Sequence, residues 1–284
     1  MTYVDTPGKK QKHPHYEHRT EKLDKKNNDF SRKKFHRIRK VSTHKKILES
    51  FGRIGMCLNN KSSNNINISD LNKVCFILIN SYEDKENDLG VGPLNDGYLV
   101  GLKHHRLGFK IFYLYNSRSD EFTSYLSFFT RNTSHSLTVF YTGRDSMYSG
   151  TQGIEFNNGS LFASSISEII SQSENDKAQM IFITDSCNGG SVFGINEIKS
   201  NTTSSNPLNL ISFYVTKSSS PKSKDSIRSH GIFTYYFFKI ISIKPDITPN
   251  GLVERINPSL SRFKEIVRFD LSKKELADRP IFFN

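Results

Sequence analysis

In the segment FITDSCNGG, residues 182–190, an apolar run is followed by Asp-Ser and then by Cys187. Two glycines follow this cysteine after one asparagine. The run predicts a buried strand, and the glycines let the backbone turn sharply where that strand ends. We expect an exposed thiol at this turn, with a backbone amide that could contribute to an anion-binding nest. A cysteine that cleaves peptides also needs a partner that helps form the thiolate and then protonates the departing amine.

The other two cysteines, Cys57 and Cys75, are expected to be buried apolar residues. Three cysteines cannot all pair, and their spacing is not typical of a metal site, so we expect free thiols in a reducing, intracellular compartment, the cytoplasm. The N-terminal sequence contains no apolar core of a signal peptide. No apolar run approaches the roughly 18–20 residues that span a bilayer, so we expect no transmembrane segment.

The elements that must position Cys187 are apolar strands alternating with helices. This alternation predicts an α/β sandwich with a largely parallel central sheet of about six strands. In such a sheet the functional site lies beyond the carboxyl ends of the strands. Three strand ends are expected to converge there, in the segments INSYED, YTGRDS and TDSCNGG. We place strands at 73–80, 110–116, 136–143, 178–186 and 210–216, and helices at 97–109, 120–132, 164–172 and 232–241.

The positive charge of the chain is concentrated at its start. Residues 1–60 hold 16 Lys and Arg against 6 Asp and Glu, whereas the whole chain has a net charge of +12. We expect a basic tail that is disordered, with one short helix at 45–58. The stretch 31–46 is either a solvated arm or a contact for nucleic acid or an anionic membrane, or it directs the protein to the nucleus.

A division of the chain follows from these patterns. A polar linker at 61–70 separates the tail from a domain at 71–284. Within the domain we expect a first half at 71–196, a polar loop at 197–208 and a second half at 209–284. A second polar loop is expected at 217–231.

The segment MIFITDSCNGG resembles the nucleophile segment of the caspase-like cysteine peptidases, and of metacaspases in particular. SLTVFYTGRDS is similar to the strand that ends in Ser-Gly-His-Gly in that family, HGIFTYYFFKI to the helix that opens the small-subunit half, and ADRPIFFN to the closing segment. The resemblance covers roughly residues 70–284, in the family's order. It implies a caspase-like three-layer α/β sandwich, with Cys187 at the nucleophile position of a cysteine-type endopeptidase.

The same resemblance implies that the proton carrier is missing. Arg144 stands at the position of the family's catalytic His, and Asp145 stands where a glycine amide serves the oxyanion hole. A guanidinium, with a pKa above about 12, does not exchange protons at neutral pH. Arg144 could still favour a Cys187 thiolate through its charge. Asp145 would place negative charge where the oxyanion develops.

Other histidines are poor replacements. His135 is expected at the wrong end of the sheet, His104 and His105 on a helix, and His230 at the border of a polar loop. We expect all four to be solvated or capping side chains. His230 is the least implausible substitute, because it begins the helix of the second half.

The resemblance also implies a substrate-binding pocket for Lys or Arg, formed by Asp96, Asp185 and Thr142. Two carboxylates at converging strand ends would bind a guanidinium bidentately. Alternatively, the two aspartates only cap turns, or Arg144 fills the pocket itself. Calcium activation in metacaspases relies on acidic residues after the catalytic His, and here only Glu155 is acidic, so no metal or other cofactor is implied.

Three functions remain open from the sequence. The first is a catalytically impaired or inactive pseudopeptidase that binds or regulates partners, such as proteins with basic segments or active caspase-like relatives. The second is a working cysteine endopeptidase that cleaves after Arg or Lys. The third is a polyanion binder that acts through the basic tail and uses the domain as a scaffold.

Overall fold

A computed structural model describes residues 44–82, 88–186, 190–195, 198, 208–217 and 231–282. Several expectations fall on residues outside these ranges. They concern the nucleophile position Cys187, His230, residues 1–43 of the basic tail and most of the two polar loops. Among the described residues, no helix combines the length and the apolar character that crossing a membrane requires.

A seven-stranded sheet forms the centre of the domain, in the order β1-β3-β2-β4-β8-β9-β10. All neighbouring strands pair in parallel except β10, which is antiparallel to β9. The expected largely parallel sheet is therefore confirmed, with seven strands. The strands are β1 (Gly55–Cys57), β2 (Lys73–Ile79), β3 (Lys110–Tyr115), β4 (Ser136–Gly143), β8 (Gln179–Ser186), β9 (Asn209–Lys217) and β10 (Glu265–Leu271).

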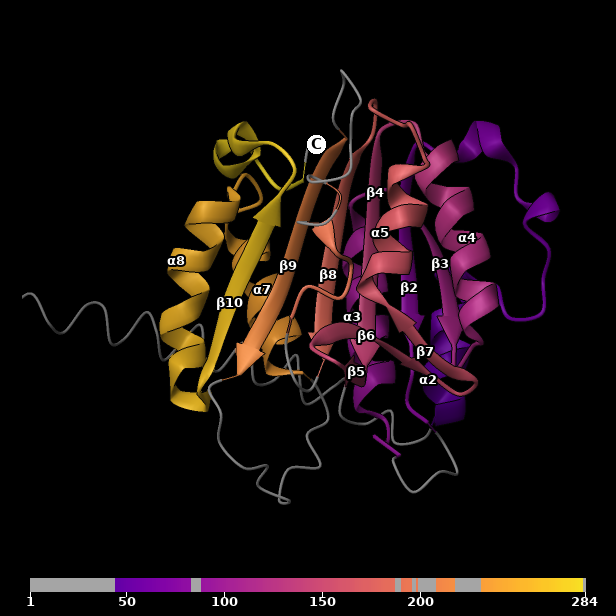
Figure 1. Ribbon diagram of the computed structural model, residues 1–284, viewed down its shortest axis with the longest axis horizontal. Helices are drawn as coiled ribbons and strands as arrows, with labels where there is room; N and C mark the ends of the chain where they lie inside the picture. The colour runs from indigo at the N-terminus through magenta and orange to yellow at the C-terminus, as the bar shows by residue number, and fades with distance from the viewer. Residues whose placement is uncertain are drawn as a thin grey trace, which may run out of the picture. The chain divides into compact units, whose positions relative to one another are not determined.

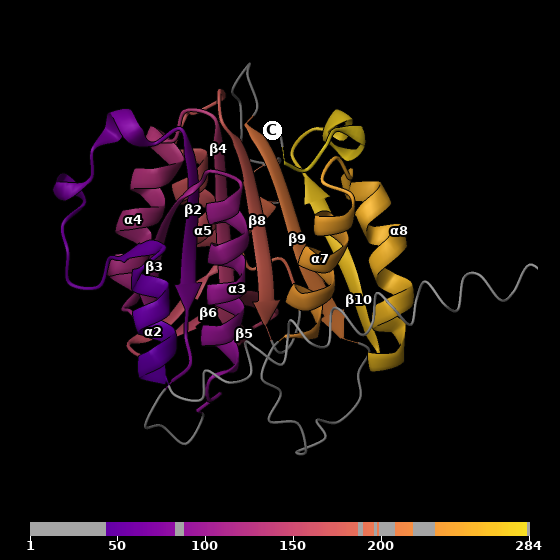
Figure 2. The ribbon, with the colours of Figure 1, turned by 180° about the vertical axis from the view of Figure 1, so that it is seen from behind.

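Helices cover both faces of this sheet, which explains why its central strands β2, β4 and β8 are buried along nearly their whole length. All eight residues of β4 are buried. One face is covered by α2 (His44–Gly52), α3 (Gly92–Arg106) and α7 (Ile232–Ile243), which lie toward the viewer in Figure 2. The other face is covered by α4 (Ser119–Asn132) and α5 (Ala163–Ser171), as Figure 1 shows. The last helix, α8 (Pro249–Leu260), packs against α7 and β10.

The folded part of the chain begins earlier than the sequence indicated. The helix expected at 45–58 is a shorter helix, α2, followed by the edge strand β1. Phe51 of α2 is fully buried and stacks on Tyr113 of β3, with ring centroids 4.1 Å apart. Gly55 pairs with Ile111, and a Cβ on Gly55 would lie 2.9 Å from the Ile111 side chain. Placing residues 44–58 in the tail was therefore wrong, because their apolar side chains complete the core.

The expected linker at 61–70 contains two short turns of 3-10 helix, η1 (Ser63–Asn65) and η2 (Ile68–Asp70). Ile66 between them is buried. Near the other end of the chain lie η3 (Ser261–Phe263) and η4 (Lys274–Asp278), and the closing segment is anchored by the Ile281 amide, which donates to the Ile247 carbonyl at 3.0 Å.

A second, small sheet follows β4 directly and was not predicted. It consists of the antiparallel strands β5 (Asp145–Tyr148), β6 (Thr151–Phe156) and β7 (Gly159–Phe162). Because β5 begins only two residues after β4 ends, this sheet lies next to the strand end on which the sequence places the site.

Candidate functional site

The carboxyl ends of three parallel strands meet at the expected edge of the sheet. Ile79 at the end of β2 is the register partner of Thr142 in β4, and Thr142 is the partner of Asp185 in β8. One residue further on, Gly143 pairs with Ser186. The chain then continues into Arg144 from β4, and from β8 into Cys187, which lies outside the described residues.

Arg144 is held in place through its backbone. Its amide donates to the Tyr82 hydroxyl at 3.2 Å, and its carbonyl accepts from the Glu155 amide at 3.1 Å and from the Tyr141 hydroxyl. The guanidinium plays no part in these three contacts. The side chain of Arg144 is partly exposed.

Tyr82 ties the end of β2 to the small sheet. Its hydroxyl donates to the Glu155 carbonyl at 2.7 Å, and Asn80 Nδ2 donates to the same carbonyl at 2.9 Å. Burial raises the pKa of Tyr82 to about 12, so its hydroxyl stays protonated at neutral pH. Tyr82 has a φ of 58°, an unusual backbone conformation for a bulky residue.

Asp145 is the first residue of β5 and is only 5 % exposed. Its register partner is Ile154 in β6. The residue that the sequence resemblance places at the oxyanion-hole glycine is thus a buried acidic residue at the start of a β-strand.

Asp96 and Asp185 come together at the start of α7. The Gly231 amide donates to both carboxylate oxygens of Asp96, at 2.9 and 2.8 Å. Thr234 donates to Asp185 Oδ2 from its amide at 3.2 Å and from its hydroxyl at 2.6 Å. A Cβ built on Gly231 would lie 2.0 Å from Asp185 Oδ2 and 3.0 Å from Asp96 Oδ2. The two carboxylates therefore converge on one glycine.

The local chemistry explains this arrangement. The first turn of a helix carries backbone amides without partners in the helix and a partial positive charge, and both favour carboxylates. Hydrogen bonds from such amides to an ionised carboxylate are stronger than those between neutral groups. Thr142, the third residue of the expected pocket, is 3 % exposed and lies beside Asp185 in the sheet.

The histidines outside this edge do not reach it, where the structure describes them. His104 is fully buried rather than solvated, which corrects the expectation for this residue. Its Nε2 lies 3.1 Å from Thr138 Oγ1 and its Nδ1 lies 3.0 Å from the Val100 carbonyl oxygen. Burial lowers the pKa of His104 to about 4. His105 and His135 are exposed, and His135 precedes the amino end of β4.

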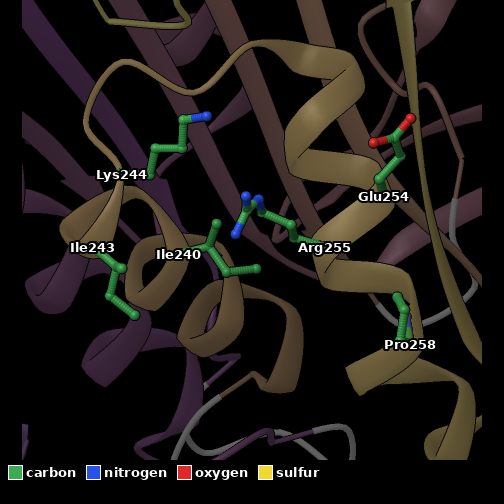
Figure 3. A pocket seen from close by; sticks show the side chains of 6 residues that line it. All are labelled: Ile240, Ile243, Lys244, Glu254, Arg255 and Pro258. Atoms are coloured by element: carbon green, nitrogen blue, oxygen red, sulfur yellow. The ribbon is translucent and has the colours of Figure 1, made fainter.

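No group of three His, Cys, Asp or Glu side chains within the described ranges is arranged to hold a metal ion. A separate cavity of about 290 Å³ lies between α7 and α8, away from the strand ends. Figure 3 shows the six residues that line this cavity: Ile240, Ile243 and Lys244 at the end of α7, and Glu254, Arg255 and Pro258 of α8.

Sequence reasoning missed four residues that shape the site: Tyr82, Tyr141, Gly231 and Thr234. Tyr82 stands in the strand-end segment INSYED, which was expected to reach the site, so its position was a usable signal. Gly231 and Thr234 have the spacing of a helix start, with a glycine followed by a hydroxyl residue in the first turn. Nothing local indicated that Tyr141 would bond back to Arg144.

No family model matches the chain, and no curated protein matches it. Among solved structures, the chain is similar to the initiator caspase Dronc of Drosophila, with a TM-score of 0.53 and 14% identity over 75% of this chain and 85% of that one. It is also similar to protein GSU0716 from Geobacter sulfurreducens, with a TM-score of 0.51 and 11% identity over 74% of this chain and 98% of that one. The fold is therefore a caspase-like α/β sandwich.

Proposed function

We propose that this protein is a caspase-fold pseudopeptidase that does not hydrolyse peptide bonds and instead binds a basic side chain of a partner protein. The observation that carries the proposal is the register of β4 and β8. Gly143 lies opposite Ser186, and the residue that follows Gly143 is Arg144 rather than a histidine. The fold thus supplies a strand end suited to a nucleophile, next to a residue that cannot carry its proton.

The chemistry supports the loss of hydrolysis. Imidazole serves cysteine peptidases because its pKa lies near the working pH. A guanidinium does not release its protons at neutral pH, so an arginine at position 144 cannot protonate a leaving amine. Loss of acid–base assistance alone costs about 10²–10⁴ in rate, and loss of one member of a nucleophile–histidine unit costs on the order of 10⁶.

His104 gives no alternative base. His104 is enclosed by Phe109, Phe238 and Phe282 and contacts the middle of β4. Its low pKa keeps it neutral, and its distance along the strand from Gly143 keeps it away from the strand end. His230, outside the described residues, is the candidate that we would test by mutation.

The binding role rests on Asp96 and Asp185. Two buried or half-buried carboxylates that converge on one point create a local negative potential, and a planar guanidinium can bridge such oxygens. The expected partner is therefore a protein with an accessible Arg or Lys. Active caspase-like peptidases that carry such a segment are possible partners of this kind.

The decisive experiment combines a cleavage assay with a binding assay. Purified protein is incubated with Arg- and Lys-terminated fluorogenic peptides, with and without calcium, and the same protein is titrated with Nα-acetyl-arginine methylamide. We expect no turnover above that of Cys187→Ala and measurable binding that Asp185→Asn weakens. The norleucine analogue, which lacks the charge, is the matched control ligand.

Turnover that disappears in Cys187→Ala would establish an active endopeptidase instead, and His230→Ala would then show whether His230 is the base. The polyanion-binding alternative stays a prediction, because residues 1–43 lie outside the described ranges.

A further inference from the structure

The carboxylate pair of the proposed binding site already has an occupant from the same chain. The Gly231 amide bonds to both oxygens of Asp96, although the two residues are 135 positions apart in the sequence. Gly231 immediately precedes α7, has an extended backbone, with φ of −61° and ψ of 132°, and is partly exposed. A positively polarised N–H therefore lies where the charge of a bound basic side chain would lie.

The two aspartates differ in how firmly they are held. Thr234 donates two hydrogen bonds to Asp185 and is itself fully buried. The neighbouring Phe233 and Phe237 are buried as well. Asp185 is thus fixed to a part of α7 that is anchored in the core. Asp96 is bound by Gly231, the partly exposed N-cap of α7, whose carbonyl accepts one helix bond from the Tyr235 amide at 3.2 Å.

The space between Gly231 and the two carboxylates is too small for a basic side chain. A single added methyl group on Gly231 would meet Asp185 Oδ2 at 2.0 Å and Asp96 Oδ2 at 3.0 Å. A guanidinium is much larger than a methyl group, so it cannot reach both carboxylates while the Gly231 backbone stays between them.

We infer that Gly231 is an autoinhibitory latch. Its amide occupies the Asp96 carboxylate and so blocks the site that Asp96 and Asp185 form. A basic side chain of a partner binds only after this amide has left Asp96. The inference rests on the proposed function, because it concerns the regulation of the same site. The apparent affinity for a basic ligand is then reduced by the fraction of molecules in which the latch is open.

A substitution that forces the latch open tests this inference. Gly231→Ala places a Cβ 2.0 Å from Asp185 Oδ2 and 3.0 Å from Asp96 Oδ2. Because Thr234 holds Asp185 with two hydrogen bonds, we expect residue 231 to shift instead and its amide to leave Asp96. Gly251→Ala is the matched control: Gly251 lies in the first turn of α8, and a Cβ there would meet nothing closer than Thr248 Oγ1 at 3.4 Å. Both changes add one methyl group near the start of a helix, and thermal unfolding checks that each variant is folded.

Nα-acetyl-arginine methylamide is titrated into wild type and both variants by calorimetry. We expect Gly231→Ala to bind about tenfold more tightly than wild type, the factor that corresponds to one hydrogen bond to a charged group. Gly251→Ala should bind as wild type does. Equal or weaker binding by a folded Gly231→Ala protein would overturn the latch and leave the binding function standing.

A second measurement uses only the wild-type protein. Amide hydrogen exchange at Gly231, followed by NMR, should accelerate when the arginine probe saturates the site, because the amide loses its carboxylate partner. Binding with unchanged protection at Gly231 would also overturn the latch. If neither wild type nor Gly231→Ala binds the probe, the binding function itself fails and the latch falls with it.

Discussion

Gly143 and Ser186 lie opposite each other at the carboxyl ends of the parallel strands β4 and β8. The residues that follow them in the chain, Arg144 and Cys187, are those that the resemblance to caspase-like peptidases assigns to chemistry. Because the register fixes where both strands end, a change at position 144 alters the chemistry of this edge without a change in the sheet.

The double change Arg144→His with Asp145→Gly should restore weak peptide cleavage after Arg or Lys. An imidazole would regain the position of the proton carrier, and a glycine amide the position in the oxyanion hole. The protein contacts at Arg144 described above involve its backbone, so a histidine can keep them. Each single change should do much less, because such residues act as a unit. Turnover of fluorogenic peptides is the measurement.

The control for this restoration is the same double variant with Cys187→Ala, which should be inactive. An inert double variant with wild-type thermal stability would mean that the loss of function extends beyond these two positions.

Cys187 should react with iodoacetamide much faster than Cys75. Cys75 lies in the core strand β2 with no exposed surface, and burial raises the pKa of its thiol well above the usual value. Arg144→Leu should slow the labelling of Cys187, because a nearby cation favours the thiolate. Mass spectrometry of digested protein gives both rates. Arg106→Leu, at an exposed position on α3, is the control, and a rate unchanged by Arg144→Leu would show that Arg144 does not act on the thiol.

Tyr82→Phe should lower the free energy of unfolding by about 1–3 kcal/mol, because it removes a buried hydroxyl that bonds to Glu155 and Arg144. Urea denaturation measures the change. Tyr148→Phe removes a hydroxyl from a side chain that is 73 % exposed and should change the stability little. An equal effect of the two substitutions would contradict the proposed role of Tyr82 in holding the end of β4.

His104 should make the protein less stable as the pH falls from about 6.5 to about 4. Its pKa is about 4 in the folded protein and near 6.5 when unfolded, so within this window the unfolded chain binds a proton that the folded chain does not. The contribution is fully present above pH 6.5, and up to about 3 kcal/mol is lost by pH 4.

Urea denaturation at pH 7.5 and pH 5.0 checks this expectation. His104→Leu should show a smaller loss between the two pH values than wild type, whereas His105→Leu, at the neighbouring exposed position, should lose as much as wild type. The same pH dependence in wild type and His104→Leu would mean that other groups govern acid sensitivity.

Long apolar runs made the central sheet predictable. The strand expected at 136–143 is β4 with the same bounds, because all eight of its residues are buried and its apolar and β-branched residues form a continuous run that charged side chains do not interrupt. By contrast, β1 has three residues, and β10 mixes buried with exposed positions, so neither produces such a run. The small sheet β5-β6-β7 was missed because its sequence is polar and rich in glycine.

The candidate site was predictable only in part. The strand ends gave the place of Asp185, whereas Asp96, which lies in α3 and not at a strand end, was placed beside it only by the resemblance. Their contacts with Gly231 and Thr234 depend on the docking of a distant helix. The segment KHHR looked solvated, and only the tertiary structure places His104 against Thr138 and the surrounding phenylalanines. Position-specific burial of this kind is not encoded in the local sequence pattern.

The three residues of β1 form one edge of the central sheet and cover part of β3. With β1 in place, the sheet ends in a very short strand, which offers few free backbone groups to a neighbouring chain. A protein truncated before residue 61 would instead expose β3, whose sequence KIFYLY is apolar and rich in aromatic residues. Such an edge is a template for intermolecular β-pairing, so the stretch Gly55–Cys57 protects the domain against self-association and aggregation.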